Sequence, residues 1–183
     1  MPSSPSQIFI PKSNCITRPM TLLTIEDQIV YQAFINIIAE KLVTVARKFY
    51  YDTTFGNLYA GKSSPFFYRK WQIGYYRYNA EIKNAYYAGY DYSASFDLTA
   101  CYDSIDHKTL TFFLNSYYGL DKEFSFKLCE LLSKWSTSSS MFKGHGIPQG
   151  PMASGLLAEA ILLYFDIEYK KKNHTEIKYF RYV

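Results

Sequence analysis

A chain of 183 residues with 48% apolar content can bury one ordinary core, which suits one domain or slightly more. The formal net charge of +4 permits contact with a phosphate backbone without requiring it, because many small domains are as basic. Cys15, Cys101 and Cys129 are odd in number and far apart, which argues against a disulfide framework and against a zinc site. We expect free, mostly buried thiols.

The N-terminal residues 1–17 contain several prolines and predict an extended arm rather than a helix. They lack an apolar run after a basic start, so no secretory signal is expected. The longest apolar stretches, residues 35–39 and 155–165, are interrupted by polar residues and are shorter than the roughly 20 residues that a membrane span needs. We therefore expect a cytoplasmic protein without a transmembrane helix.

Residues 24–45 predict the clearest helix, and Thr24 followed by Asp27 forms a variant capping box at its start. Its predicted buried face consists of apolar residues at helical spacing: Ile29, Val30, Ala33, Phe34, Ile37, Ile38, Leu42 and Val45. Residues 53–65 predict a loop. Residues 66–88 predict a second helix that ends at Gly89, with one apolar stripe formed by Trp71, Tyr75, Tyr78, Ile82 and Tyr86.

The second half of the chain predicts an alternation of strands and helices. Strands are expected at 92–98 and 177–183, helices at 106–116, 121–135 and 152–169, and a loop rich in Ser and Gly at 136–150. Asp106 is the expected N-cap of the first of these helices. This order favours an α+β fold with a split βαβ arrangement, in which helices cover one face of a small antiparallel sheet.

Two phrases of the sequence belong together. Residues 95–107 read Ser-Phe-Asp-Leu-Thr-Ala-Cys-Tyr-Asp-Ser-Ile-Asp-His, and residues 146–150 read Gly-Ile-Pro-Gln-Gly. Their order resembles motifs A and B in the palm of reverse transcriptases, and residues 178–183 are similar to the approach into motif C. The resemblance implies a partial fingers region in 1–90, a right-hand polymerase palm in 91–183 and no thumb. It also implies that the reading frame continues with two Asp residues and that this chain is an incomplete, inactive fragment.

The resemblance assigns a role to each matching position of the first phrase. Asp97 would be the catalytic carboxylate and a metal ligand, and Leu98 would offer its backbone carbonyl to a metal. The complete enzyme would hold two Mg²⁺ ions, which prefer hard oxygen ligands. Tyr102 would be the residue that selects deoxynucleotides. An isolated Asp at a strand end more often forms a turn or caps a helix, and Asp103 and Asp106 are expected to do so.

The second phrase and the N-terminal region add candidate nucleotide-binding residues. Gly150 would let the backbone approach a nascent base pair, and Gln149 can both donate and accept hydrogen bonds at its edge. The N-terminal region also resembles the fingers motif of bacterial reverse transcriptases. Arg18 would then reach the triphosphate with its bidentate guanidinium, and Lys12 is a second candidate. For Arg18 and Lys12 a solvated surface residue is the alternative.

Basic and aromatic residues alternate in residues 67–71, where Arg69 and Lys70 would meet template phosphates. The alternative is a helix with a solvated basic face and a buried Trp71. We expect Trp71 to be buried, and both interpretations stay open for Arg69 and Lys70.

The activity implied by the resemblance is RNA-templated synthesis of DNA from deoxynucleoside triphosphates, with an RNA template and a DNA primer or product as partners. Residues 27–33 and 150–159 look most like bacterial reverse transcriptases linked to phage defence or abortive infection, and retron and group II intron enzymes are alternatives. A non-catalytic nucleic-acid-binding module or a decayed polymerase fragment is the alternative from another class. An RNA-templated RNA polymerase is disfavoured by Tyr102.

Overall fold

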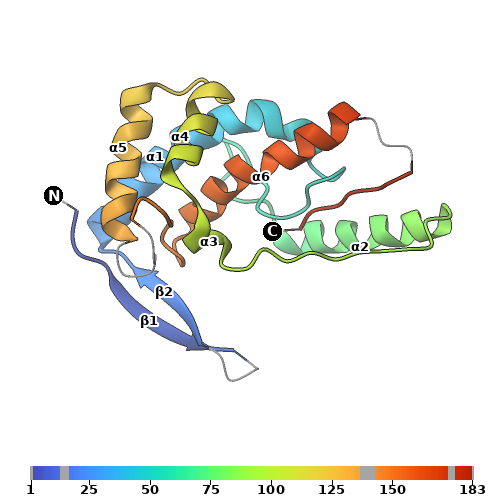
Figure 1. The fold of residues 1–183 in the computed structure, drawn as a ribbon, viewed down its shortest axis with the longest axis horizontal. Helices are drawn as coiled ribbons and strands as arrows, with labels where there is room; N and C mark the ends of the chain where they lie inside the picture. The colour runs from blue at the N-terminus through green and yellow to red at the C-terminus, as the bar shows by residue number, and fades with distance from the viewer. Residues whose placement is uncertain (1, 13–16, 137–142, 173–175, 183) are drawn as a thin grey trace.

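The computed structural model describes residues 2–12, 17–136, 143–172 and 176–182. Within these ranges it is a mixed α and β structure with six α-helices, one 3₁₀ turn and a two-stranded antiparallel sheet (Figure 1). The elements are β1 Ser6–Pro11, β2 Thr17–Leu22, α1 Ile25–Ala46, the 3₁₀ turn η1 Arg47–Phe49, α2 Trp71–Tyr87, α3 Cys101–Ser104, α4 His107–Ser116, α5 Lys122–Trp135 and α6 Met152–Lys172. The predicted α+β class is confirmed at this level.

Strands β1 and β2 form a hairpin that extends away from the helices (Figure 1). The register runs from Ser6 opposite Leu22 to Pro11 opposite Thr17. The extended conformation predicted for the N-terminal region is confirmed, but its pairing with β2 was not predicted.

The core lies between α1, α4, α5 and α6. Helix α6 packs against both α1 and α4, and α4 packs against α5. The first half of α6 is buried on all sides, as is typical of a central helix in a helical layer. The largest fully buried side chains are Trp135, Tyr31, Phe49, Phe55, Ile35, Ile38, Leu42, Leu110, Leu114, Leu128, Leu132 and Ile147.

Helix α1 begins as predicted, because the Thr24 hydroxyl accepts a hydrogen bond of 3.3 Å from the Asp27 backbone N–H. The predicted buried face is partly wrong: Ile29 is 64% exposed, and Val30 and Ile37 are exposed as well. The face that enters the core consists of Asp27, Tyr31, Ile35, Ile38, Ala39, Leu42 and Ala46. Because α1 is apolar on more than one side, spacing alone did not select the face that meets α6.

By length and composition alone, Ile25–Phe49 is apolar enough to cross a membrane, with a mean hydropathy of 1.5. The core helix of a soluble protein passes the same test. Here Tyr31, Ile35 and Leu42 of this segment are fully buried in the protein core.

Helix α2 differs from the prediction at its start and in its burial. It begins at Trp71 rather than at residue 66, and Trp71 is 65% exposed, so the predicted burial of Trp71 is wrong. Its buried residues are Gly74 and Ala85. A Cβ atom on Gly74 would lie 2.1 Å from the Phe55 carbonyl oxygen, so only glycine permits this close approach of α2 to the body. Gly89, with a φ of 94°, follows the end of the helix as predicted.

The two strands predicted in the second half are not formed in the described residues. Residues 92–98 are irregular and exposed, with Phe96 91% exposed. Residues 177–182 are also irregular, apart from a one-residue bridge between Arg181 and Thr54, and Val183 lies outside the described residues. A strand needs a neighbour to bond its N–H and C=O groups, and neither segment has a ladder partner here.

Other predictions for the second half hold in part. The Asp106 carboxylate caps α4 by accepting a 2.9 Å hydrogen bond from the Thr109 backbone N–H. Asp103, which was expected to fix the turn, instead lies within α3, where its Oδ1 is buried without a hydrogen-bond partner. Cys101 and Cys129 are free thiols and half-buried rather than buried, and Cys15 lies outside the described residues. Of the predicted loop, residues 143–150 are irregular and 137–142 are not described.

Candidate functional site

The loop that precedes α6 is joined to the N-terminal hairpin through the backbone. The Thr21 N–H of β2 donates a 2.6 Å hydrogen bond to the Gln149 carbonyl. Gly150 follows with a φ of 134°, and a Cβ at this position would lie 3.2 Å from the Thr21 carbonyl oxygen. The backbone at Gly150 therefore lies close to β2 of the same chain, an approach that the sequence did not predict.

Helix α6 holds this loop from the other side. The Ser154 hydroxyl donates to the Pro148 carbonyl, which leaves it to accept the 2.9 Å hydrogen bond from the Tyr31 hydroxyl of α1. Burial raises the pKa of Tyr31, so this hydroxyl stays neutral and a donor at ordinary pH. The Gln149 loop is thus fixed by α1, β2 and α6 together.

Tyr102 lies in α3, directly behind the same loop. Its carbonyl accepts a 2.9 Å hydrogen bond from the Ile147 N–H. Burial raises the pKa of the Tyr102 hydroxyl, Cys101 adds to the rise, and the cation of Arg18 opposes it. Arg18, which is exposed on β2, therefore acts electrostatically on Tyr102. Backbone hydrogen bonds therefore join the three segments that carry the predicted residues Arg18, Tyr102, Gln149 and Gly150.

Lys12 lies at the same end of the hairpin as Arg18. It follows Pro11, and the register places Ile10 opposite Arg18. Lys12 is exposed, and no ion pair of Lys12 or Arg18 occurs within the part of the chain that the structure describes. Both cations are therefore available to an anion.

Asp97 and Leu98 lie on the exposed segment that leads into α3. Ala100, with a left-handed φ of 50°, turns the chain into this helix. Burial raises the pKa of the Cys101 thiol, and the negative charge of Asp97 raises it further. Asp97 therefore lies near the start of α3, on the segment that also carries Tyr102, but it is not on a strand.

No group of three or more His, Cys, Asp or Glu residues suited to a metal ion occurs among the described residues. Asp97 is one carboxylate, and two divalent cations need several converging oxygen ligands. Within the described residues, Asp97 and the Leu98 carbonyl alone therefore do not complete a site for two Mg²⁺ ions.

Arg69 and Lys70 belong to a different cluster, at the start of α2. The Arg69 guanidinium lies 5.2 Å from the ring centre of Tyr50 and 5.4 Å from that of Tyr51. Arg77 of α2 lies 4.3 Å from the Tyr51 ring centre. Lys70 is exposed. The sequence indicated Arg69 and Lys70 but missed Arg77, because its partner Tyr51 lies on a turn that spacing along α2 does not reveal.

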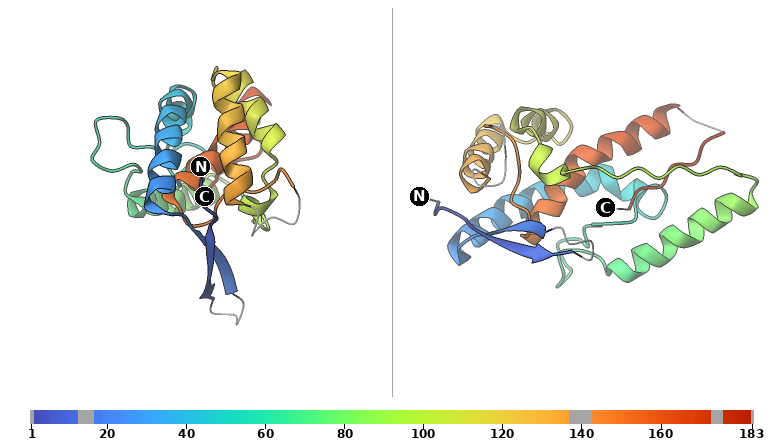
Figure 2. Two further views of the ribbon diagram at one scale, coloured as in Figure 1. Left: turned by 90° about the vertical axis from the view of Figure 1, so that its left-hand side faces the viewer. Right: turned by 60° about the horizontal axis from the view of Figure 1, so that its bottom comes forward.

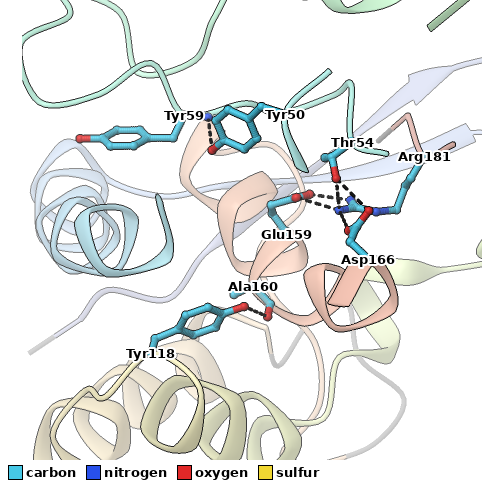
Figure 3. Close-up of polar contacts among 8 residues, drawn as sticks. All are labelled: Tyr50, Thr54, Tyr59, Tyr118, Glu159, Ala160, Asp166 and Arg181. Atoms are coloured by element: carbon cyan, nitrogen blue, oxygen red, sulfur yellow. Dashed lines mark hydrogen bonds and ion pairs between the residues drawn. The ribbon is translucent and has the colours of Figure 1, made fainter. Parts of the chain in front are cut away.

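A buried ionic network ties the C-terminal segment to α6 (Figure 3). Arg181 donates to both carboxylate oxygens of Glu159, at 2.6 and 2.8 Å, and also to Asp166. The Thr54 hydroxyl accepts from Arg181 at 3.2 Å and donates to Asp166 at 2.9 Å. We refer to Arg181, Glu159, Asp166 and Thr54 as the Arg181 network.

Electrostatics explain why the Arg181 network needs its cation. Burial raises the pKa of Glu159, and Arg181 opposes that rise. Burial alone would lower the pKa of Arg181, but Glu159 and Asp166 more than offset it and the pKa is raised. The sequence does carry a signal for this network, because Glu159 and Asp166 are two helical turns apart on an apolar helix.

A comparison with models of known protein families found no match, and a comparison with curated proteins found none either.

Proposed function

We propose that this chain supplies the fingers and palm residues of an RNA-directed DNA polymerase. The observation that carries the proposal is the joining of three distant segments around the Gln149 loop. Thr21 of β2 binds the Gln149 carbonyl, and Tyr102 accepts from Ile147. Arg18 lies on the same strand as Thr21.

In this proposal each residue has a chemical task. Arg18, aided by Lys12, binds phosphate oxygens of a deoxynucleoside triphosphate. The Tyr102 ring lies against the sugar and excludes a 2′-hydroxyl. Gln149 and Gly150 face the nascent base pair. Asp97 and the Leu98 carbonyl would supply two of the oxygen ligands of Mg²⁺, and further carboxylates would be needed to complete the site.

The proposal also includes the sheet of a polymerase palm, which is not formed in the described residues. Residues 92–98 and 177–182 run in the same direction across the molecule (Figure 2). The Lys178 Nζ atom lies 5.6 Å from the ring centre of Tyr90, two residues before the first segment. A strand running in the opposite direction between them would pair with both edges. Exposed rings of α2, among them Tyr75 and Tyr86, would gain cover from such a sheet.

The proposal is tested by primer extension with the complete open reading frame on an RNA template. We expect Asp97→Ala to abolish synthesis. Asp91→Ala is the matched control, because Asp91 is an exposed carboxylate on the same irregular segment, and it should leave synthesis intact. Extension that survives Asp97→Ala would remove Asp97 from the reaction.

A non-catalytic nucleic-acid-binding module is the second candidate. It is favoured by the cluster of Arg69 and Arg77 around Tyr51, which pairs cations with an aromatic ring and needs no metal. The longest natural product would then bind RNA with a steep salt dependence and synthesise nothing. The role in phage defence is part of the first candidate and is tested by phage plating on cells that carry the gene or its Asp97→Ala variant.

A further inference from the structure

We infer that Arg181 is a positioning residue, which holds residues 177–182 between α6 and α2 at a fixed place relative to the Gln149 loop. The attachment of residues 177–182 follows from contacts within this chain. The expected effect of Arg181 on DNA synthesis rests on the proposed function.

Arg181 is fixed by its backbone as well as by its side chain. Its N–H donates a 2.7 Å hydrogen bond to the Thr53 carbonyl, and its carbonyl accepts a 2.9 Å hydrogen bond from the Phe55 N–H. The side chain meanwhile spans Glu159 and Asp166 of α6 (Figure 3). Arg181 therefore joins the segment both to the 53–55 turn and to α6, and Tyr169 of α6 holds the other end of the segment by donating a 2.7 Å hydrogen bond to the Ile177 carbonyl.

The neighbours of Arg181 alternate between the two sides of the segment. On the α6 side, the ring centre of Tyr179 lies 5.4 Å from that of Tyr169. On the other side, Tyr182 lies 5.7 Å from Tyr75 and 5.6 Å from Tyr78, both in α2. This alternation is that of a strand, although no ladder is formed. Fixing Arg181 therefore also fixes the ring that α2 contacts.

Helix α6 connects this attachment to the candidate nucleotide site. Its first turn holds the Gln149 loop through Ser154, and its second and fourth turns hold Arg181 through Glu159 and Asp166. Because α6 is a continuous helix buried along its first half, it sets the distance between the loop and the C-terminal segment. Loss of the Arg181 network would release the Arg181 end of the segment from α6 and from the 53–55 turn and leave the loop in place.

The test must separate release of the segment from unfolding of the whole chain. Arg181→Met alone leaves two buried carboxylates without their cation and lowers the stability of the whole chain, so faster exchange in that variant would not be specific to the segment. The triple variant Glu159→Gln, Asp166→Asn, Arg181→Met removes all three charges together. Arg47→Met, which changes an exposed arginine, is the matched control.

The readout is residue-resolved amide hydrogen exchange, measured by NMR on the 183-residue chain. In the triple variant, exchange of the backbone amides at positions 55 and 181 should become about tenfold faster or more. Exchange of the Ile35 and Leu42 amides in α1 should change by less than about twofold. A rise of equal size in all four amides, or no rise in any, overturns the inference.

A second readout uses the complete open reading frame and Arg181→Lys, which keeps the charge but loses the guanidinium fork. Arg181 contacts no residue of the candidate nucleotide site, so kcat should fall while KM for the deoxynucleotide stays within about twofold. If the unchanged enzyme synthesises nothing, the proposed function fails and amide exchange still decides the attachment. If KM alone rises, or if synthesis falls without faster exchange at Phe55, the positioning role is wrong.

Discussion

Helices α6 and α2 have comparable lengths, 21 and 17 residues, and opposite surroundings. Helix α6 lies in the core, whereas α2 buries only a glycine and an alanine. On α2, Trp71, Tyr75, Ile82 and Tyr86 are exposed on one stripe. Exposed apolar surface of this extent is typical of an interaction surface. The comparison indicates that the free energy of folding comes mainly from packing between α1, α4, α5 and α6, whereas α2 presents an exposed apolar surface.

The largest expected difference between the two regions is at their tryptophans. Trp135 of α5 is fully buried, and Trp135→Ala should lower the free energy of unfolding by about 3–5 kcal/mol through loss of burial and creation of a cavity. Trp71→Ala on α2 is the matched control and should change it by less than about 0.5 kcal/mol. Urea unfolding followed by circular dichroism measures both. Comparable losses in the two variants would mean that α2 is packed as tightly as the core.

The next effect concerns charge within α6. Arg181→Met should cost about 3 kcal/mol at neutral pH, because two buried carboxylates lose their cation. The loss should shrink as pH falls towards the ordinary glutamate pKa of 4.5. The folded-state pKa of Glu159 is raised, so the folded state binds more protons than the unfolded state, and rising pH above 4.5 destabilises it. In Arg181→Met, the cation that opposes the burial-driven rise in the pKa of Glu159 is gone, so the destabilisation at neutral pH is larger.

Urea unfolding of the wild type and of Arg181→Met at several pH values measures this dependence. The triple variant with Glu159→Gln and Asp166→Asn should lose it, since no titrating group of the Arg181 network remains. A loss for Arg181→Met that is constant with pH would show that the pKa of Glu159 does not depend on Arg181.

The sequence predicted those features that are set by neighbouring residues. The capping of α1 by Thr24 and of α4 by Asp106 depends on residues three positions apart, and both were confirmed. The end of α2 at Gly89 depends on one residue that tolerates positive φ. All residues that determine such a feature lie within about four positions of each other in the sequence.

Features that depend on distant partners were missed or wrong. The alternation in residues 92–98 predicted a strand, but alternation forms no ladder without a neighbouring edge. Trp71 was expected to be buried, yet helical spacing does not say whether another element covers the stripe. In the candidate site, Arg18 and Gln149 were predicted separately. The contact that joins their segments is a backbone hydrogen bond from Thr21, which no side-chain pattern encodes.

A smaller effect is expected at Tyr102, which lies between the helical body and the exposed segment. Tyr102→Ala in the complete open reading frame should admit ribonucleotides, with a loss of sugar discrimination of about tenfold or more. Primer extension with ribonucleotides and deoxynucleotides in separate reactions measures the ratio. Tyr117→Ala, at the end of α4, is a control that should leave the ratio unchanged. An unaltered ratio in the Tyr102 variant would contradict its assignment as the sugar-selecting residue.

The smallest effect belongs to the cap of α4, at the point where the exposed segment re-enters the helical body. Asp106→Ala should lower the free energy of unfolding by about 1 kcal/mol, because the Thr109 N–H loses its acceptor. Burial acts to raise the pKa of Asp106, but the hydrogen bonds from Thr109 outweigh it and the pKa lies below 3.8. The cap therefore stabilises the fold above pH 3.8 and is lost as pH falls through the lowered pKa. Asp106→Asn keeps a neutral acceptor and should retain most of the stability at pH 7 while losing this acid dependence. An equal loss in the Ala and Asn variants would assign the effect to the negative charge near the start of α4 rather than to the hydrogen bond.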